Sequence, residues 1–310
     1  MDFRISSEQA ELAEAVRVFL SQTHGPDVLR ALDGKGGRDP AIWQGLADMG
    51  LFGLLVPEDD GGMGRSLIDG ALIARECGRV CLAEPLVDTA FVAVPWLMAC
   101  GETDDLAAIA RGELSVQLPH SINPWVVGGE GESLAGVDPL RQLATAPSKG
   151  TDDPYLLDLG ALMMAAQLVG LAEAMLEQAV AYSQVREQFG QPIGGFQAIK
   201  HKLADVAVEL EFVRPVLWRA AQALEDGLQS ASVHVSHAKY TAADAAYLAS
   251  ESAIQVYGAM GYTYEVDLHF WMKRTWALGG AWGGRSFHYR RVDAAILDGA
   301  MPIGPQHTFA

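Results

Sequence analysis

The stretch Arg186–Ile193, with the sequence REQFGQPI, decides how the second half of the chain folds. Apolar residues recur at helical intervals over 168–182 before it and over 199–217 after it. Glycine followed closely by proline ends a helix, because glycine adopts the left-handed conformation and proline has no amide hydrogen to donate. The sequence therefore predicts two long helices joined by a tight corner, and a third helix from about Ser230 to Tyr257. Long helices with apolar stripes pack as antiparallel bundles.

The side chains at this corner suit a phosphorylated, planar cofactor. The Arg186 guanidinium is permanently charged and forks onto phosphate oxygens, and the helix that follows directs free N–H groups at an anion. Phe189 offers a flat apolar surface, and Gln188 and Gln197 can both donate and accept hydrogen bonds. The residues alone leave a second interpretation open, an ordinary helix corner whose arginine is solvated or paired with a carboxylate.

The pattern Arg-x-x-Phe-Gly-x-Pro-Ile, followed by Phe-Gln-x-Ile and Leu-Ala-Asp up to residue 205, resembles the signature of the acyl-CoA dehydrogenase family. Members of this family are flavoenzymes that desaturate acyl-CoA thioesters. The resemblance implies a mainly α, acyl-CoA dehydrogenase-like fold, with an N-terminal helical domain (1–111), a reduced middle β segment (112–157) and a C-terminal four-helix bundle (158–310) that contacts FAD and forms oligomers. The stretch 43–62 also resembles the family, with Trp-x-x-Leu-Ala-x-x-Gly-Leu followed by Val-Pro-Glu-x-x-Gly-Gly.

The family resemblance also implies roles for residues of the corner. Arg186 is expected to contact the FAD pyrophosphate of a neighbouring subunit, and Gln188 and Phe189 are expected to line the cofactor. Gln197 is expected to approach the adenosine half of FAD.

A second motif, QVYGAMGY at residues 255–262, resembles the Gln-x-x-Gly-Gly-x-Gly-Tyr/Phe turn of the same family. Glycine in such a turn lets the backbone approach a pyrophosphate closely. The resemblance adds Gln255, Gly258 and Ala259 to the expected cofactor-binding residues, although Ala259 stands where the family has glycine. An ordinary glycine turn at the end of a helix is the alternative.

The chain lacks the glutamate with which the family removes the substrate α proton. One family position for this base lies nine residues past an arginine that matches Arg274, and it is Gly283 here. The other lies ten residues before a glycine that matches Gly170, and it is Gly160. Asp158 is the nearest carboxylate, but two residues are about 200° around a helix, so it is expected to face away. We therefore expect no catalytic residue in this chain.

The middle segment is too small to enclose a flavin ring. Short apolar runs at Leu114–Leu118 and Trp125–Val127 predict a few strands, which cannot form an independent sheet and are expected to lean on the helices. Nothing over 112–157 matches the Thr-Glu-Pro-x-Ala-Gly-Ser-Asp stretch of the family's β domain.

Some bacterial relatives combine the same losses with a partner chain in α2β2 assemblies. By resemblance, this chain is a β-type subunit that shares FAD with a catalytic acyl-CoA dehydrogenase subunit and serves an acyl-CoA substrate such as a steroid side-chain CoA thioester. A scaffold of the same fold without flavin and a self-sufficient homo-oligomeric dehydrogenase with another base remain open. A ferritin-like metal protein would need Glu-x-x-His pairs, which the chain lacks, and His234 and His237 have no matching carboxylates, so no metal is expected.

Composition bounds the remaining functions. The chain of 310 residues has a formal net charge of −17, which repels nucleic acid and anionic membrane surfaces, so neither is an expected partner. Its three cysteines, Cys77, Cys81 and Cys100, are expected to be buried free thiols rather than a disulfide or zinc site. The N-terminal residues show no secretory signal pattern, and no run approaches the ~18 apolar residues of a membrane span, which predicts a cytoplasmic protein.

Overall fold

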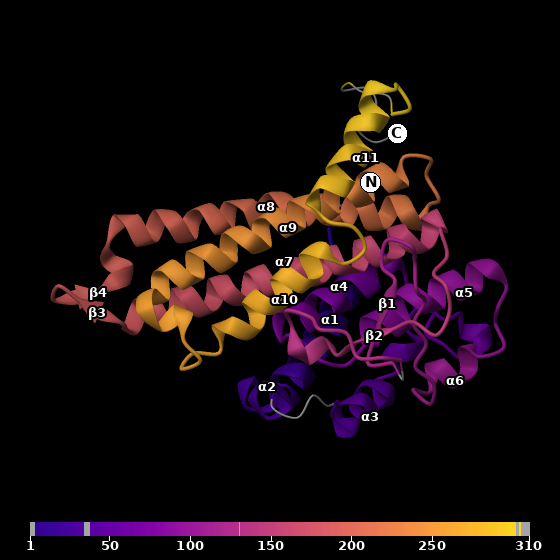
Figure 1. The fold of residues 1–310 in the computed structure, drawn as a ribbon, viewed down its shortest axis with the longest axis horizontal. Helices are drawn as coiled ribbons and strands as arrows, with labels where there is room; N and C mark the ends of the chain where they lie inside the picture. The colour runs from indigo at the N-terminus through magenta and orange to yellow at the C-terminus, as the bar shows by residue number, and fades with distance from the viewer. Residues whose placement is uncertain (1–3, 34–37, 130, 302–303, 305–310) are drawn as a thin grey trace.

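Helices form most of the chain, and the predicted mainly α fold is confirmed (Figure 1). The computed structural model describes residues 4–33, 38–129, 131–301 and 304. The first three residues, which bear on the predicted lack of a signal segment, lie outside the described residues, as do most residues after Met301.

The N-terminal part is a group of short helices. They are α1 (Ser7–Thr23), α2 (Pro26–Asp33), α3 (Pro40–Asp48), α4 (Leu67–Arg79), α5 (Val94–Cys100) and α6 (Leu106–Ala110), with the 3-10 helices η1 (Leu51–Gly53) and η2 (Glu58–Asp60) and the π-helix η3 (Val87–Ala93). Side-chain caps fix where the first helices begin: Ser6 and Ser66 form capping boxes, and Asp39 accepts the Ala41 N–H at 2.9 Å.

The C-terminal part is a bundle of long helices. Its helices are α7 (Pro154–Val185), α8 (Gln197–Glu225), α9 (Ala231–Tyr257), α10 (Leu268–Gly280) and α11 (Arg285–Leu297). Figure 1 shows α7 to α10 side by side, whereas α11 rises away from the bundle. Helix α7 begins at Pro154, earlier than the predicted start near residue 158, because Asp153 caps it through the Tyr155 and Leu156 N–H groups.

Helix α7 is the central helix of the core. It is long and apolar enough to cross a membrane by composition alone, but 94% of its most apolar window is buried inside the protein. Glu173 on α7 accepts hydrogen bonds from Arg75 and Arg79 on α4 and from Arg214 on α8. Burial opposes ionisation of this carboxyl, yet the arginines hold its pKa below the ordinary value, so an ion-pair cluster joins the N-terminal part to the bundle.

Two short strands form a small hairpin in the described part of the middle segment, in agreement with the few strands predicted there, and the strand predicted at Trp125–Val127 is confirmed. Strand β1 (Trp125–Val127) pairs antiparallel with β2 (Leu143–Thr145), which the sequence did not predict, and the turn η4 (Pro139–Arg141) precedes β2. The predicted strand at Leu114–Leu118 is absent. The Gln117 side chain accepts the Val127 N–H at 2.5 Å and donates to the Val127 carbonyl, so a side chain replaces the backbone ladder there.

Candidate functional site

The corner motif forms the tip of the bundle, at the end far from α5 and α6 (Figure 1). Its two short strands are β3 (Glu187–Gln188) and β4 (Gln191–Pro192). Phe189 and Gly190 link them with φ angles of +54° and +80°, the pattern of a two-residue hairpin turn. The Phe189 side chain is 93% exposed and meets the Phe196 ring edge-on, with 6.1 Å between the ring centres. The hairpin therefore carries an aromatic ring outward from the protein.

Arg186 and Gln197 flank this hairpin on the surface. Arg186 follows the last residue of α7 in an extended conformation, and no described residue forms an ion pair with its guanidinium within 4 Å. Gln197 opens α8, and Phe196 stands at the N-cap without a side-chain hydrogen bond to the first turn. The first N–H groups of a long helix thus lack a side-chain cap beside an exposed arginine, an arrangement that suits an anion.

The second motif forms the turn η6 (Gly258–Tyr262) that follows α9. Gly258 has φ +64° and ψ −135°, a conformation that favours glycine, and open space surrounds its Cα. Gln255 in the last turn of α9 and Ala259 in η6 are both exposed. Glycine is needed here for backbone conformation, and the free space beside it leaves room for a ligand.

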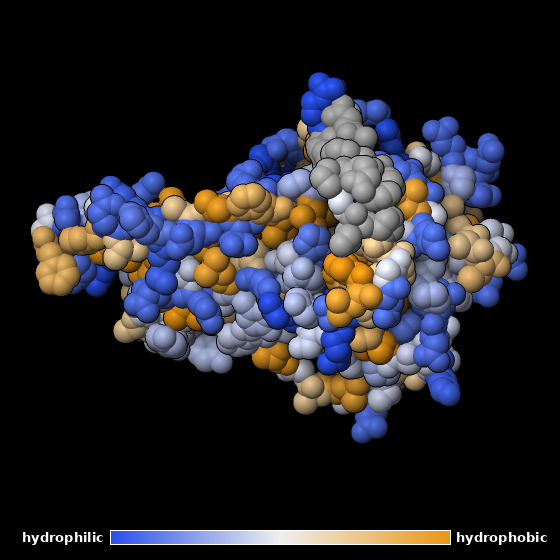
Figure 2. Space-filling model, turned by 90° about the horizontal axis from the view of Figure 1, so that it is seen from above, coloured by the Kyte–Doolittle hydropathy of each residue, from blue (hydrophilic) through white to orange (hydrophobic). Residues whose placement is uncertain are grey.

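Packing brings the two motifs to the same end of the bundle. The Tyr182 ring on α7 stacks on Tyr257 on α9 with 4.2 Å between the ring centres, and the Tyr182 hydroxyl donates to the Met260 sulfur. The tyrosine pair thereby holds η6 against the end of α7, a few residues before Arg186. All the expected cofactor residues lie at this end, and Figure 2 shows hydrophobic side chains among the polar ones there.

The two glycines expected at the family's base positions, Gly160 and Gly283, lie elsewhere, buried in the interior on either side of Trp282. The Trp282 indole covers Gly160 so closely that a Cβ on residue 160 would lie 2.1 Å from the ring. Gly283 has φ +97°, and a Cβ there would meet the Phe287 ring at 2.5 Å and the His288 Nε2 at 2.8 Å. Larger side chains at either position require the surrounding core to move.

A chain of hydrogen bonds fixes the backbone of Trp282. Its N–H donates to Asn123 Oδ1 at 3.2 Å, and its carbonyl accepts from His288 Nε2 at 2.9 Å. Burial, with the nearby Lys239 charge, lowers the pKa of His288 to about 3, so the imidazole is neutral near pH 7. A neutral ring that donates through Nε2 accepts at Nδ1 from the Ser236 hydroxyl, 3.1 Å away.

Asp158 belongs to the same buried network. Its carboxylate accepts from Arg291 Nη1 at 2.9 Å and from the Ser232 hydroxyl. The Arg291 guanidinium also donates to Ser236, which joins this ion pair to the His288 hydrogen bonds. The carboxylate is committed to these two partners, and the expectation that Asp158 is not a base for a ligand beside Gly160 stays a prediction.

The junction between the middle segment and the bundle is closed. Asp138 beside β2 is buried against Arg274 on α10, whose Nη1 also donates to the Leu82 carbonyl at 2.8 Å. Arg141 is buried 4.0 Å from Asp88. The cavity beside these side chains holds only about 10 Å³, room for about one water molecule. No flavin ring fits between these surfaces.

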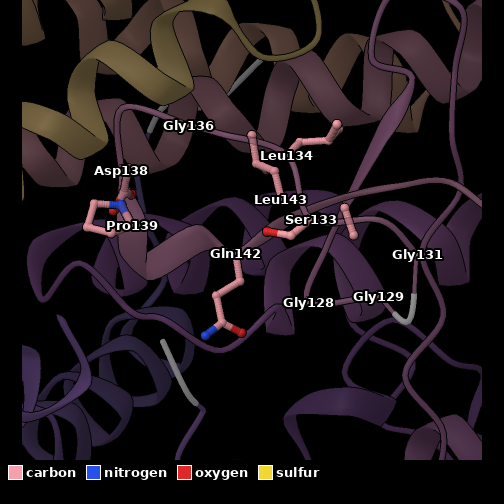
Figure 3. A pocket seen from close by; sticks show the side chains of 11 residues that line it. Gly128, Gly129, Gly131, Ser133, Leu134, Gly136, Asp138, Pro139, Gln142 and Leu143 are labelled. Carbon is pink, nitrogen blue, oxygen red and sulfur yellow. The ribbon is translucent and has the colours of Figure 1, made fainter. Parts of the chain in front are cut away.

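A glycine-rich hollow of about 510 Å³ lies on the middle segment, lined by Gly128, Gly129, Gly131 and Gly136 (Figure 3). Its glycines serve packing: a Cβ on Gly131 would strike the Thr145 carbonyl at 2.1 Å. Asp138 is the charged side chain among its described lining residues, and it is committed to Arg274. The hollow therefore offers no free basic group to an anionic thioester.

Other candidate chemistry from the sequence finds little support in the described residues. Cys77 and Cys81 are buried as expected, but Cys100 is exposed, so the prediction of buried thiols was wrong for that residue. Within the ranges that the structure describes, no three His, Cys, Asp or Glu side chains group closely enough to hold a metal. Arg285 forms a surface ion pair with Asp244 at 2.7 Å.

Sequence comparisons identify the class that this fold and these motifs define. The acyl-CoA dehydrogenase N-terminal domain matches residues 6–105, and the acyl-CoA dehydrogenase C-terminal domain matches residues 154–290. The chain belongs to the acyl-CoA dehydrogenase family, whose members are flavin-dependent oxidoreductases.

Particular relatives share nearly the whole chain. The chain is 30% identical to acyl-CoA dehydrogenase IpdE2 of Mycolicibacterium smegmatis, over 94% of this chain and 100% of the relative. It is 34% identical to acyl-CoA dehydrogenase FadE34 of Mycobacterium tuberculosis, over 83% of this chain and 42% of that protein.

Solved structures share the fold. A chain of the ChsE4–ChsE5 complex from Mycobacterium tuberculosis superposes with a TM-score of 0.82 at 20% identity, covering 96% of this chain and 99% of that one. A chain of a Tcur3481–Tcur3483 steroid ACAD variant superposes with a TM-score of 0.84 at 23% identity, covering 95% and 99%.

Sequence reasoning missed Trp282, Asp138 and Arg141, which close the interior. The sequence shows glycine at positions 160 and 283, yet it does not indicate that the Trp282 ring fills the space beside Gly160. The sequence signal that could have indicated this packing is Trp282 directly before Gly283 and Gly284, because a glycine turn can fold a large side chain back onto a helix.

Proposed function

We propose that this chain is a subunit of an FAD-dependent acyl-CoA dehydrogenase and completes the FAD site of a catalytic partner chain. The observation that carries the proposal is a difference in exposure between the expected cofactor-binding residues and the expected base positions. Arg186 and Phe189 are exposed at the tip of the bundle. Gly160 is instead buried against Trp282, and Gly283 is buried against Phe287 and His288. In this proposal the chain supplies cofactor contacts and the partner supplies the base.

The residues at the tip fit the outer half of the cofactor. Arg186 binds a pyrophosphate oxygen through its guanidinium, and the uncapped start of α8 adds N–H donors to the same anion. Phe189 and Gln188 line the cofactor, Gln197 lies toward the adenosine, and the turn of Gln255, Gly258 and Ala259 approaches the phosphates. FAD supplies the acceptor for the substrate hydride. This chain's own residues bind and orient it, and none of them moves a proton.

The partner is a second, complete acyl-CoA dehydrogenase chain, in an α2β2 assembly. Three observations support a partner of this kind: the closed cavity of about 10 Å³ beside Arg274, the exposed Phe189, and the exposed apolar side chain of Val185 near the same end. The ChsE4–ChsE5 complex, which has the same fold, contains two named chains.

The proposed substrate is an acyl-CoA thioester with a bulky acyl group, such as a steroid side chain. Support comes from the fold shared with the Tcur3481–Tcur3483 protein, which is described as a steroid ACAD. A cytoplasmic location is part of the same proposal and stays a prediction.

Co-expression with a full-length acyl-CoA dehydrogenase encoded nearby tests the proposal. Flavin absorbance and dye-coupled turnover of acyl-CoA are recorded for each chain alone and for the complex. We expect bound flavin and turnover only in the complex, and we expect R186A to lower flavin content at least tenfold without dissociating the chains. R290A, which removes an exposed arginine of α11, is the matched control and should retain flavin.

Two results would contradict the proposal. Turnover by this chain alone would favour a self-sufficient dehydrogenase. A stable complex whose flavin content does not respond to R186A would favour a scaffold that takes no part in cofactor binding.

A further inference from the structure

Trp282 adopts a conformation that a side chain of its size rarely takes. Its φ angle is +56°, in the left-handed region, and its side chain is only 2% exposed. Bulky residues are strained in this region, so they persist there only when the surrounding structure holds them. The outlier lies directly before Gly283 and its ring lies on Gly160, the two positions where the family resemblance places the base.

Contacts from the middle segment and from α11 hold the residue in place. Asn123 of the middle segment accepts its N–H, and His288 of α11 donates to its carbonyl. The His120 ring lies 6.0 Å from the indole, tilted by 47°. The loop between α10 and α11 is thereby pinned so that the ring cannot swing away without breaking these contacts.

The indole also leaves a polar atom without a partner. Its Nε1 is buried and has no hydrogen-bond partner among the described residues. An aliphatic side chain would fill a structural core without burying a donor, so strain and an unpaired N–H together mark a position constrained by more than packing.

We propose that the Trp282 indole is a plug that fills the space an acyl group would need in this chain. This inference rests on the proposed function, in which the acyl site belongs to the catalytic partner. The plug means that this chain binds no acyl thioester by itself. Each pair formed by this chain and one catalytic chain therefore holds a single acyl site. Because a single side chain fills the space, replacing Trp282 with a smaller residue should open it again.

The W282A variant tests the plug, because it removes the indole and leaves a cavity on the order of 100–150 Å³, a size that binds small aromatic molecules. The melting temperature of W282A is measured with and without free indole. We expect W282A to melt at a lower temperature than the unmodified chain, and indole to raise its melting temperature by several degrees. W276A removes a tryptophan of α10 that is 40% exposed and serves as the control, for which indole should have no effect.

If W282A does not fold, W282F keeps a ring in place and leaves a smaller cavity, and benzene replaces indole as the probe. A folded variant that neither indole nor benzene stabilises would overturn the plug. So would a wild-type chain that, alone, binds butyryl-CoA in a calorimetric titration.

Stoichiometry distinguishes this inference from the proposed function. The flavin-loaded wild-type complex should bind one butyryl-CoA for each pair of unlike chains. Two bound thioesters for each pair, with flavin still dependent on Arg186, would refute the plug and leave the proposed function standing. Loss of the Arg186 dependence, with indole still stabilising W282A, would refute the proposed function and leave the filled cavity established.

Discussion

The two ends of α7 differ in what surrounds them. Near its start, Gly160 is covered by Trp282, and polar groups such as Asp158 and His288 are paired inside the protein. At its end, Arg186 and Phe189 stand in solvent. One helix therefore joins a closed region, whose side chains pack against one another, to an open region whose side chains are free to contact a ligand or another chain.

This difference in burial separates residues that stabilise the fold from residues that are available for binding. Substitutions in the closed region leave buried groups unpaired or overpacked, which destabilises the chain itself. Substitutions in the open region remove no internal contact of consequence, so their effects should appear only in an assembly. The predictions that follow test this division, beginning with the largest expected change in the free energy of unfolding.

The buried ion pair between Asp138 and Arg274 should give the largest effect. D138A leaves the Arg274 guanidinium, which is 3% exposed, without its carboxylate, and we expect a loss of about 3–5 kcal/mol. Urea denaturation of the isolated chain measures it. D244A removes the same residue type from the exposed pair with Arg285 and should change stability by about 1 kcal/mol or less. Equal losses in the two variants would show that the junction is not closed.

Two glycines of the bundle should respond to alanine with opposite signs. G160A places a methyl group against the Trp282 ring, and we expect it to destabilise the chain by about 1–3 kcal/mol. G280A, at the end of α10, meets nothing within 4 Å, so the better helix propensity of alanine should leave stability unchanged or raise it by up to about 1 kcal/mol. Thermal melts compare the two, and a harmless G160A would mean that Trp282 moves aside easily.

Low pH should lower the free energy of unfolding through protonation of His288. Unfolded, this histidine binds a proton below about pH 6.5, whereas folded its pKa is about 3. The unfolded state therefore holds one more proton between these values, so this residue makes the free energy of unfolding fall as the pH drops from 6.5 toward 3.

The H288N variant should remove this dependence. We expect the slope of stability against pH between 6 and 4 to decrease by about 1.4 kcal/mol per pH unit, the contribution of one proton. Denaturant titrations at several pH values measure it. H201N, at an exposed position on α8, should keep the wild-type slope. An unchanged slope in H288N would mean that the buried imidazole already carries a proton.

Local signals in the sequence were sufficient to predict much of the fold. The helix predicted from about Ser230 to Tyr257 is α9, and the corner at Arg186 falls where α7 ends. Such features depend on residues within one turn of each other, so their chemistry is visible in a short window. The roles of the corner residues in cofactor binding stay predictions.

Contacts between distant parts of the chain could not be predicted in this way. No strand forms at Leu114–Leu118, where the Gln117 side chain, rather than the backbone, bonds the Val127 backbone. Strand β2 forms in a stretch that has no clear alternation of apolar and polar residues. Trp282 reaches Gly160 across 122 residues of sequence, through a turn whose direction depends on Asn123 and His288. The sequence shows that positions 160 and 283 carry no carboxylate, but it does not show that the Trp282 ring lies against Gly160.

The smallest expected change lies in the open region, at Phe189. Its φ of +54° strains a phenylalanine, whereas asparagine before glycine is favoured in this turn, so F189N should raise the stability of the isolated chain by about 0.5–1 kcal/mol. In the complex the same variant should bind flavin more weakly, because the exposed ring is gone. F212A, which removes an exposed ring from the middle of α8, is the control for the loss of apolar surface and should leave flavin affinity unchanged. Denaturation of the chain and flavin titration of the complex give the two quantities. If F189N destabilises the chain, or leaves flavin affinity as it was, Phe189 contributes to the fold rather than to a ligand, and the division between the two ends of α7 does not hold at its tip.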